Sequence, residues 1–126
     1  MHKYPRKVKQ GIEYFNKADF YEAHEYFEDA WRETEDDSRE FYRALLHLSG
    51  GYYRLTQDRS SAARKFFMRS LHWLETFPNT HLGLDIGSLK AHLQSLITEI
   101  NSGLDSQTIL RQHPYRITSA NIKGTT

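Results

Sequence analysis

The sequence contains no cysteine, and only 3 of its 126 residues are proline. The lack of cysteine excludes disulfides, thiolate nucleophiles and cysteine-ligated zinc sites. No apolar run approaches the roughly 20 residues that span a bilayer, and no apolar stretch of the kind found in secretory signals follows the basic residues at the start of the chain. We therefore expect a cytoplasmic protein with no membrane segment.

Neither sign of charge is in clear excess. The chain has 17 Lys and Arg against 16 Asp and Glu, which gives a formal net charge of +1. The basic residues Arg64, Lys65 and Arg69 are interpreted as the solvated face of a helix, and no dense basic cluster occurs elsewhere. Since binding to a polyanion depends on concentrated positive charge, we expect no nucleic-acid partner and no anionic membrane partner.

Helical periodicity is what the sequence does contain. Apolar residues recur at steps of three and four, which predicts helices over about residues 4–17, 20–34, 38–57, 60–76 and 86–102, with one further turn near Ile109. No segment alternates between apolar and polar residues, so no sheet is expected. The predicted fold is all-α, a compact bundle of about five helices that forms one domain over residues 1–112. Residues 113–126 are polar and aperiodic, and they are expected to be a flexible tail.

Capping residues place several of these boundaries. Asp19 is the expected N-cap of the second helix, and Glu22 stands three residues later, as in a capping box. Gly103 suits the position after the end of the fifth helix. The remaining expected N-caps are Ser38 or Asp37 for the third helix, Ser60 or Asp58 for the fourth, and Asp85 for the fifth.

The third predicted helix is apolar around most of its circumference and is expected to be the central one. Gly50 and Gly51 at its middle indicate a close approach by another helix, since glycine otherwise costs about 1 kcal/mol there. A weak repeat also appears at an offset of forty residues: the second helix carries Ala23, Tyr26, Phe27 and Trp31, and the fourth carries Ala63, Phe66, Phe67 and Leu71. The first four helices are therefore interpreted as two copies of a helical hairpin, resembling tetratricopeptide packing.

The second predicted helix places ionisable groups on its apolar face. His24 and Glu28 share a side of this helix with Phe20, Phe27 and Trp31. Burying an unpaired polar group costs on the order of 1–3 kcal/mol, so these side chains require partners.

One hypothesis pairs these groups within the protein, and the other pairs them with a ligand. In the first, Glu28 forms a buried ion pair with Arg43 of the third helix, and His24 bonds to Glu28, to His47 or to a tyrosine hydroxyl. In the second, His24 and Glu28 hold a metal ion, with further ligands from His47 and from Glu22 or Glu25. No cofactor can be named, and the HExxE pattern over residues 24–28 lacks the second histidine of the zincin motif.

The same stretch resembles the signature of the domain of unknown function 309 family, a family of small all-helical proteins. The resemblance extends over about residues 8–100 and rests on these residues: Phe15, Asn16, Asp19, Phe20, Tyr21, Glu22, Ala23, His24, Glu25, Phe27, Glu28 and Trp31; the run 41–48; Tyr52–Leu55; Ala62 and Ala63; Leu71 and Leu74; Phe77 and Pro78; and the run 83–86.

The resemblance implies an all-α bundle and a shared polar cluster, but no activity. The implied cluster comprises Glu22, His24, Glu25, Glu28 and Trp31, and Glu25 enters it through the resemblance. This chain departs from the pattern in the third helix, where Arg43 and His47 stand at positions expected to be glutamine. The electrostatics of the pocket are therefore expected to differ between members.

Two function classes follow from these observations. The favoured one is a non-enzymatic binding or scaffold domain that takes a protein partner or associates with itself. The alternative is a small metal- or ligand-binding protein, or a hydrolase-like enzyme, that uses Glu22, His24, Glu25 and Glu28. The lack of a cofactor fingerprint and of any nucleophile set favours the first.

Overall fold

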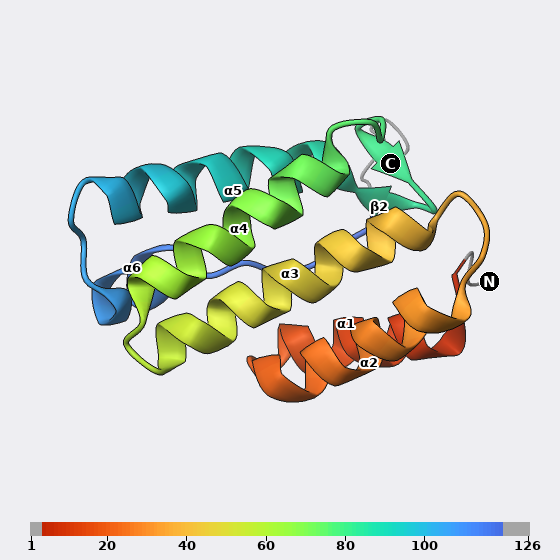
Figure 1. Cartoon of the computed structure of the whole chain (residues 1–126), viewed down its shortest axis with the longest axis horizontal. Helices are drawn as coiled ribbons and strands as arrows, with labels where there is room; N and C mark the ends of the chain where they lie inside the picture. Colours follow the sequence, from red (N-terminus) through yellow and green to blue (C-terminus); the bar gives the residue numbers. More distant parts are fainter. Residues whose placement is uncertain (1–3, 120–126) are drawn as a thin grey trace.

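A computed structural model describes residues 4–119 of the chain, and within this range it contains six α-helices and one two-stranded hairpin (Figure 1). The elements are α1 Arg6–Asn16, α2 Phe20–Glu33, α3 Arg39–Thr56, α4 Ser60–Leu74, β1 Thr80–His81, β2 Leu84–Asp85, α5 Ile86–Asn101 and α6 Ser106–Gln112. The all-α prediction is confirmed. In the described part of the chain, no helix is both long and apolar enough to cross a membrane.

Helix α3 is the centre of the fold, as predicted. It packs against α2 on one side and α4 on the other, and α6 contacts it as well (Figure 1). Eleven of its residues are buried, whereas α1, at the edge of the molecule, buries Val8, Gly11, Ile12 and Phe15. Helix α5 packs against α4, on the side of α4 away from α2 (Figure 1).

The first four helices form two equivalent hairpins, α1–α2 and α3–α4. In each hairpin, a glycine of the first helix lies against the ring of a fully buried phenylalanine in the second. A Cβ atom on Gly11 would lie 2.6 Å from the ring of Phe27, and a Cβ atom on Gly51 would collide with the ring of Phe67 in the same way. Both pairs obey the forty-residue offset, so the repeat predicted from four apolar positions extends to the packing of the hairpins.

The turns of the two hairpins also match. Ala18 has φ 66° and Asp58 has φ 62°, and each is the residue just after the C-cap of its helix. In the first turn, Ala18 N–H donates to the carbonyl of Phe15 and Asp19 N–H donates to that of Tyr14. The second turn has the same two bonds forty residues later. This is the Schellman arrangement, in which a left-handed residue ends the helix and satisfies its last carbonyls.

Most predicted helix ends are correct, and two caps differ. Asp19 and Asp85 accept hydrogen bonds from the backbone N–H groups three residues on, as expected of N-caps. The N-cap of α4 is Arg59, one residue away from either predicted candidate, and it makes no side-chain cap bond. Ser38 is the N-cap of α3, but its hydroxyl lies 3.0 Å from His81 Nε2 and makes no side-chain cap bond.

The hairpin of β1 and β2 is the one sheet in the described residues, and no sheet was expected from the sequence. The strands pair antiparallel, with His81 opposite Leu84. The two residues between them, Leu82 and Gly83, have φ 54° and 78°, as a type I′ hairpin turn requires. Strands of two residues are too short to show the alternation by which a strand is recognised.

The segment that follows α6 differs from the predicted flexible tail. Through residue 119 it is bound to the domain: Asn16 forms two hydrogen bonds with the backbone of Ile117, at 2.9 and 3.1 Å, and Ile117 itself is buried. The ring of Tyr115 stacks on His92 of α5, with centroids 4.6 Å apart. The rest of the predicted tail, residues 120–126, lies outside the described part of the chain.

Candidate functional site

The outward face of α3 lies between α2 and α4 and carries a row of polar side chains. Arg43, His47, Gly50 and Arg54 follow one another at steps of four, three and four, so they share one face of the helix. Between Phe41 and Leu55, the residues of α3 that are not buried are Arg43, His47, Tyr53 and Arg54. This face, together with the facing side chains of α2 and α4, is called the α3 groove.

Two hollows lie along the α3 groove. One, the His24 hollow, has a volume of about 170 Å³ and is lined by Tyr21, His24, Glu25, Gly50, Tyr53, Arg54 and Phe66. The other, the Trp73 hollow, is an open depression of about 320 Å³ lined by Arg43, His47, Arg69 and Trp73. Phe66 of α4 separates them, because its ring contacts His47 and also lies over Gly50. The groove therefore contains two hollows along one helix, with Phe66 between them.

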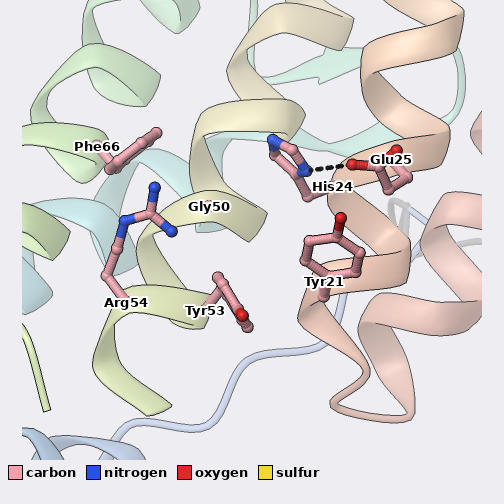
Figure 2. Close-up of a pocket in the computed structure, with 7 residues that line it drawn as sticks. All are labelled: Tyr21, His24, Glu25, Gly50, Tyr53, Arg54 and Phe66. Atoms are coloured by element: carbon pink, nitrogen blue, oxygen red, sulfur yellow. Dashed lines mark ion pairs between the residues drawn. The ribbon is translucent and has the colours of Figure 1, made fainter. Parts of the chain in front are cut away.

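Figure 2 shows the side chains that line the His24 hollow. The imidazole of His24 projects from α2 toward the turn of α3 that holds Gly50, while Arg54 and Phe66 lie on the opposite side. The rings of Tyr21 and Tyr53 form one end, with centroids 5.4 Å apart. The glycine has a steric role, because a Cβ atom on Gly50 would lie 3.0 Å from the Phe66 ring.

Polar atoms in this hollow lack full hydrogen bonding. His24 Nδ1 is buried with no hydrogen-bond partner. Glu25 Oε2 lies 3.4 Å away, and the two groups form an ion pair only when the imidazole carries a proton. The Glu25 charge is the main cause that raises the pKa of Tyr21. Since most buried polar groups in folded proteins are bonded, an unbonded histidine nitrogen at a hollow marks a place where a ligand group would be stabilised.

His24, Glu25 and Glu28 form the one group of potential metal ligands in the described residues. A ligand atom from each lies within 4.8 Å of the others. Two atoms bound to one ion at about 2.1 Å are at most about 4.2 Å apart, so small side-chain rotations would bring these atoms into range. The set of one histidine and two carboxylates suits zinc, manganese or iron. The other predicted ligands, His47 and Glu22, are not part of the cluster.

The predicted ion pair between Glu28 and Arg43 is wrong. Glu28 Oε2 pairs instead with Arg32, one turn along the same helix, at 2.7 Å, and the Glu28 side chain is 26% exposed. Surface pairs of this kind contribute about 0–1 kcal/mol. The predicted buried network therefore does not form between these two helices, because successive turns of α2 supply a closer partner.

Arg43 has a different environment from the one predicted. Its guanidinium carbon lies 4.8 Å from the ring centroid of Trp31 and 4.3 Å from that of Trp73, and Arg43 also pairs with Glu40 at 3.3 Å. A guanidinium between two indole rings is held by cation–π attraction on both faces. Trp31 lines neither hollow, but its ring packs against Arg43, which does.

His47 is neutral at physiological pH. Burial lowers its pKa to about 4, and the nearby charges of Arg69, Arg43 and His24 contribute in the same direction. Its Nδ1 atom is buried without a hydrogen-bond partner. His24 and His47 thus each have a buried ring nitrogen without a hydrogen-bond partner.

The remaining predicted residue, Glu22, stands apart from both hollows. It is exposed in the first turn of α2, where its backbone N–H donates to Asp19 Oδ1 at 3.4 Å. In a full capping box the Glu22 side chain would accept a hydrogen bond from the Asp19 backbone N–H. Here that N–H donates instead to the carbonyl of Tyr14. The capping interpretation of Asp19 is thus correct, and Glu22 does not line the site.

Two arginines of the groove were missed as site residues. Arg54 and Arg69 lie against the Phe66 ring, with their guanidinium carbons 5.0 and 5.9 Å from its centroid. The spacing of Arg43, His47, Gly50 and Arg54 was the signal available in the sequence. Arg64 was interpreted as part of a solvated face of α4, but its side chain donates a hydrogen bond to Asn101 of α5 at 2.7 Å.

Comparisons with known proteins place the chain among proteins of unknown function. A family model described as "Domain of unknown function (DUF309)" matches residues 8–66. A protein of Aquifex aeolicus (strain VF5), named only "Uncharacterized protein", is 22% identical over 91 residues, which cover 71% of this chain. The matched region is 27% of that relative's length. Over residues 8–66 the chain thus matches the DUF309 family, and the resemblance inferred from its sequence motif is confirmed.

Proposed function

We propose that this protein is a non-enzymatic binding module that takes a short segment of a protein partner into the α3 groove. The observation that carries the proposal is the alignment of the two hollows on one face of α3, with Phe66 between them. A site elongated along a helix suits an elongated ligand better than a compact one.

The dimensions of the groove support a peptide. The polar row runs from Arg43 to Arg54, and eleven steps along a helix span about 16 Å at 1.5 Å per residue. An extended peptide of about five residues has the same length, at about 3.3 Å per residue.

The lining of the groove suits peptide recognition. Aromatic rings stand at both ends, Tyr21 and Tyr53 in the His24 hollow and Trp73 in the other. Tyr21 is one of the large hydrophobic side chains that the structure leaves exposed, at 49%. Aromatic and arginine side chains dominate the binding energy of protein interfaces, because they bury much area and also offer polar contacts.

A library of random peptides about ten residues long, enough to span the groove as a strand, tests this proposal. Peptides selected on the wild-type protein are expected to lose about tenfold or more in affinity for Tyr53→Ala and for Trp73→Ala, which remove one aromatic wall from each hollow. Calorimetry measures the affinities, and amide chemical shifts locate the bound peptide.

Met68→Ala is the matched control. Met68 is a large exposed side chain of α4, 44% exposed, and it lies outside both hollows. Its removal is expected to leave peptide affinity within about twofold, as for contacts outside a hot spot. The proposal fails if no peptide is enriched, or if the selected peptides bind both aromatic variants as tightly as the wild type.

A second function is favoured by one observation, the convergence of His24, Glu25 and Glu28. In this alternative the protein binds a divalent metal, with these three residues as ligands and water in the remaining positions. Zinc, manganese or iron is expected in stoichiometric amount in the purified protein and absent from His24→Ala. Elemental analysis decides the matter, with His72→Ala as control because His72 is an exposed histidine of α4 outside the cluster. A metal-free wild-type protein that also fails to bind added zinc would exclude this alternative.

Two further expectations from the sequence are kept as proposals, a cytoplasmic location and the absence of a nucleic-acid partner. The near balance of basic and acidic residues supports the second. Cell fractionation tests the location. A salt-sensitive gel shift with duplex DNA or RNA would contradict the expectation about nucleic acid.

A further inference from the structure

The side chains that line the α3 groove carry an excess of positive charge. Arg43, Arg54 and Arg69 line the two hollows, whereas Glu25 is the one acidic residue in their lining. The near balance of charge over the whole chain hides this local excess. Since Glu25 stands on α2 and Arg69 on α4, a ligand in the groove meets a field that points from α4 to α2.

Within residues 4–119, the arginines on the α4 side of the groove have no acidic partner. Neither Arg54 nor Arg69 makes an ion pair or a side-chain hydrogen bond in the described part of the chain, and each contacts the ring of Phe66 instead. Other arginines of this chain are bonded, such as Arg32 to Glu28 and Arg64 to Asn101. Arg54 and Arg69 thus present unbonded donors at a shared aromatic surface, one from each hollow.

Glu25 and Glu28 of α2 have partners of their own. Glu25 lines the same hollow as Arg54, but it stands on α2 beside His24, and Glu28 pairs with Arg32. His47, which contacts Phe66 between the two hollows, supplies no negative charge. The lining of the two hollows therefore has one carboxylate, Glu25, against three arginines, and its positive charge is not fully balanced.

We propose that the segment bound in the α3 groove is acidic and that Arg54 and Arg69 hold its carboxylates on either side of Phe66. This inference rests on the function proposed above and names the chemistry of the partner. The charges are complementary, because planar guanidinium groups bind carboxylates through paired hydrogen bonds, whereas the Glu25 carboxylate on the α2 side repels an acidic segment in the reverse orientation. Acidic side chains face α4, and the uncharged or basic side of the segment faces α2.

A titration of the full-length protein with hexaglutamate tests the proposal at low ionic strength. The Nε–Hε signals of Arg54 and Arg69 are expected to shift with a single saturable binding curve, whereas hexaglutamine and hexalysine leave them unchanged. Arg54→Gln and Arg69→Gln are each expected to weaken hexaglutamate binding by about tenfold, the equivalent of one charge-assisted hydrogen bond. Arg69→Lys, which keeps the charge but not the planar donor pair, is expected to recover part of the affinity.

Arg64→Gln is the matched control, because it removes the same charge from the same helix at a side chain that faces α5. It is expected to change the affinity by less than about twofold. The assignment is overturned if Arg64→Gln weakens binding as much as Arg69→Gln, if hexaglutamine binds as tightly as hexaglutamate, or if only a phosphoserine peptide binds. Circular dichroism verifies that each variant is folded.

The two proposals fail in different ways. If library-selected neutral peptides bind in the groove while hexaglutamate does not bind, the acidic specificity is wrong and the binding function stands. If neither binds, both are wrong. If hexaglutamate binds and the arginine variants weaken it selectively, both are supported.

Discussion

The hairpins α1–α2 and α3–α4 have the same local construction but different surroundings. Each has a glycine against a buried phenylalanine and a turn with a left-handed residue. The first hairpin lies at the edge of the molecule, whereas α3 is enclosed by α2, α4 and α6. The difference teaches that local sequence builds the hairpin, and that its position in the bundle decides what each residue of the repeat experiences.

The polar face of α3 shows this most clearly. His47 stands where the first hairpin has Lys7, at the forty-residue offset. Lys7 is 39% exposed and pairs with Glu33 at 2.7 Å, whereas His47 is partly buried with an unbonded nitrogen. The same position of the hairpin thus faces solvent in one copy and the α3 groove in the other.

Alanine at the two glycines provides the strongest test of the comparison. Gly51→Ala is expected to lower the free energy of unfolding by about 2–3 kcal/mol, because the added Cβ meets the enclosed ring of Phe67 and overpacking outweighs the gain in helix propensity. Gly11→Ala is expected to cost about 1 kcal/mol or less, since α1 can move away from the core. Urea denaturation measures both, and equal losses would show that enclosure does not matter.

The second-largest expected difference between the two hairpins is in the pH dependence of stability. The folded-state pKa of His47 is about 4, below its ordinary 6.5, so its contribution is fully present above pH 6.5 and is lost as pH falls toward 4. Relative to His47→Gln, the wild type is expected to lose about 2 kcal/mol over this range, after allowance for partial exposure. Lys7→Gln, the control in the other hairpin, is expected to leave that slope intact. Parallel wild-type and His47→Gln curves would contradict the burial of this group.

Substitutions at the C-terminal ends of α1 and α3, the first helices of the two hairpins, are expected to change stability by less. Asn16→Ala is expected to cost about 1 kcal/mol, because it leaves the buried backbone groups of Ile117 without their partners. Its counterpart Thr56 bonds to a carbonyl of its own helix, so Thr56→Ala is expected to cost less than about 0.5 kcal/mol. Hydrogen exchange of the Ile117 amide distinguishes the two variants, because it is expected to be faster in Asn16→Ala and unchanged in Thr56→Ala.

The smallest expected effect concerns the turns, and it is stabilising. Ala18→Gly relieves a left-handed residue with a Cβ and is expected to add about 0.5–1 kcal/mol to stability. Asp58→Gly is expected to add less, because aspartate tolerates this conformation better than alanine. Thermal unfolding measures both changes. A destabilised Ala18→Gly variant would mean that the loss of chain entropy outweighs the relief.

The sequence predicted the helices because their signals are local. Asp19 and Asp85 cap helices from within three residues, and apolar periodicity marks the face that α3 buries. The hairpin at Leu82 and Gly83 gave no such signal, because its strands are two residues long. The site was predicted less well: His24, Glu25, Arg43 and His47 do line the hollows, but the partner chosen for Glu28 was wrong because a turn of its own helix supplies Arg32.

By itself, the sequence determined the helices, their order and the duplicated hairpin, because periodicity, caps and the left-handed turns act within a few residues. Only the tertiary structure decided which polar residues meet. The segment after α6 is held by Asn16, a hundred residues earlier in the chain, and Arg54 and Arg69 come together over Phe66 because α3 and α4 pack side by side. Such pairings depend on how helices are placed in space, and no spacing along one helix specifies them.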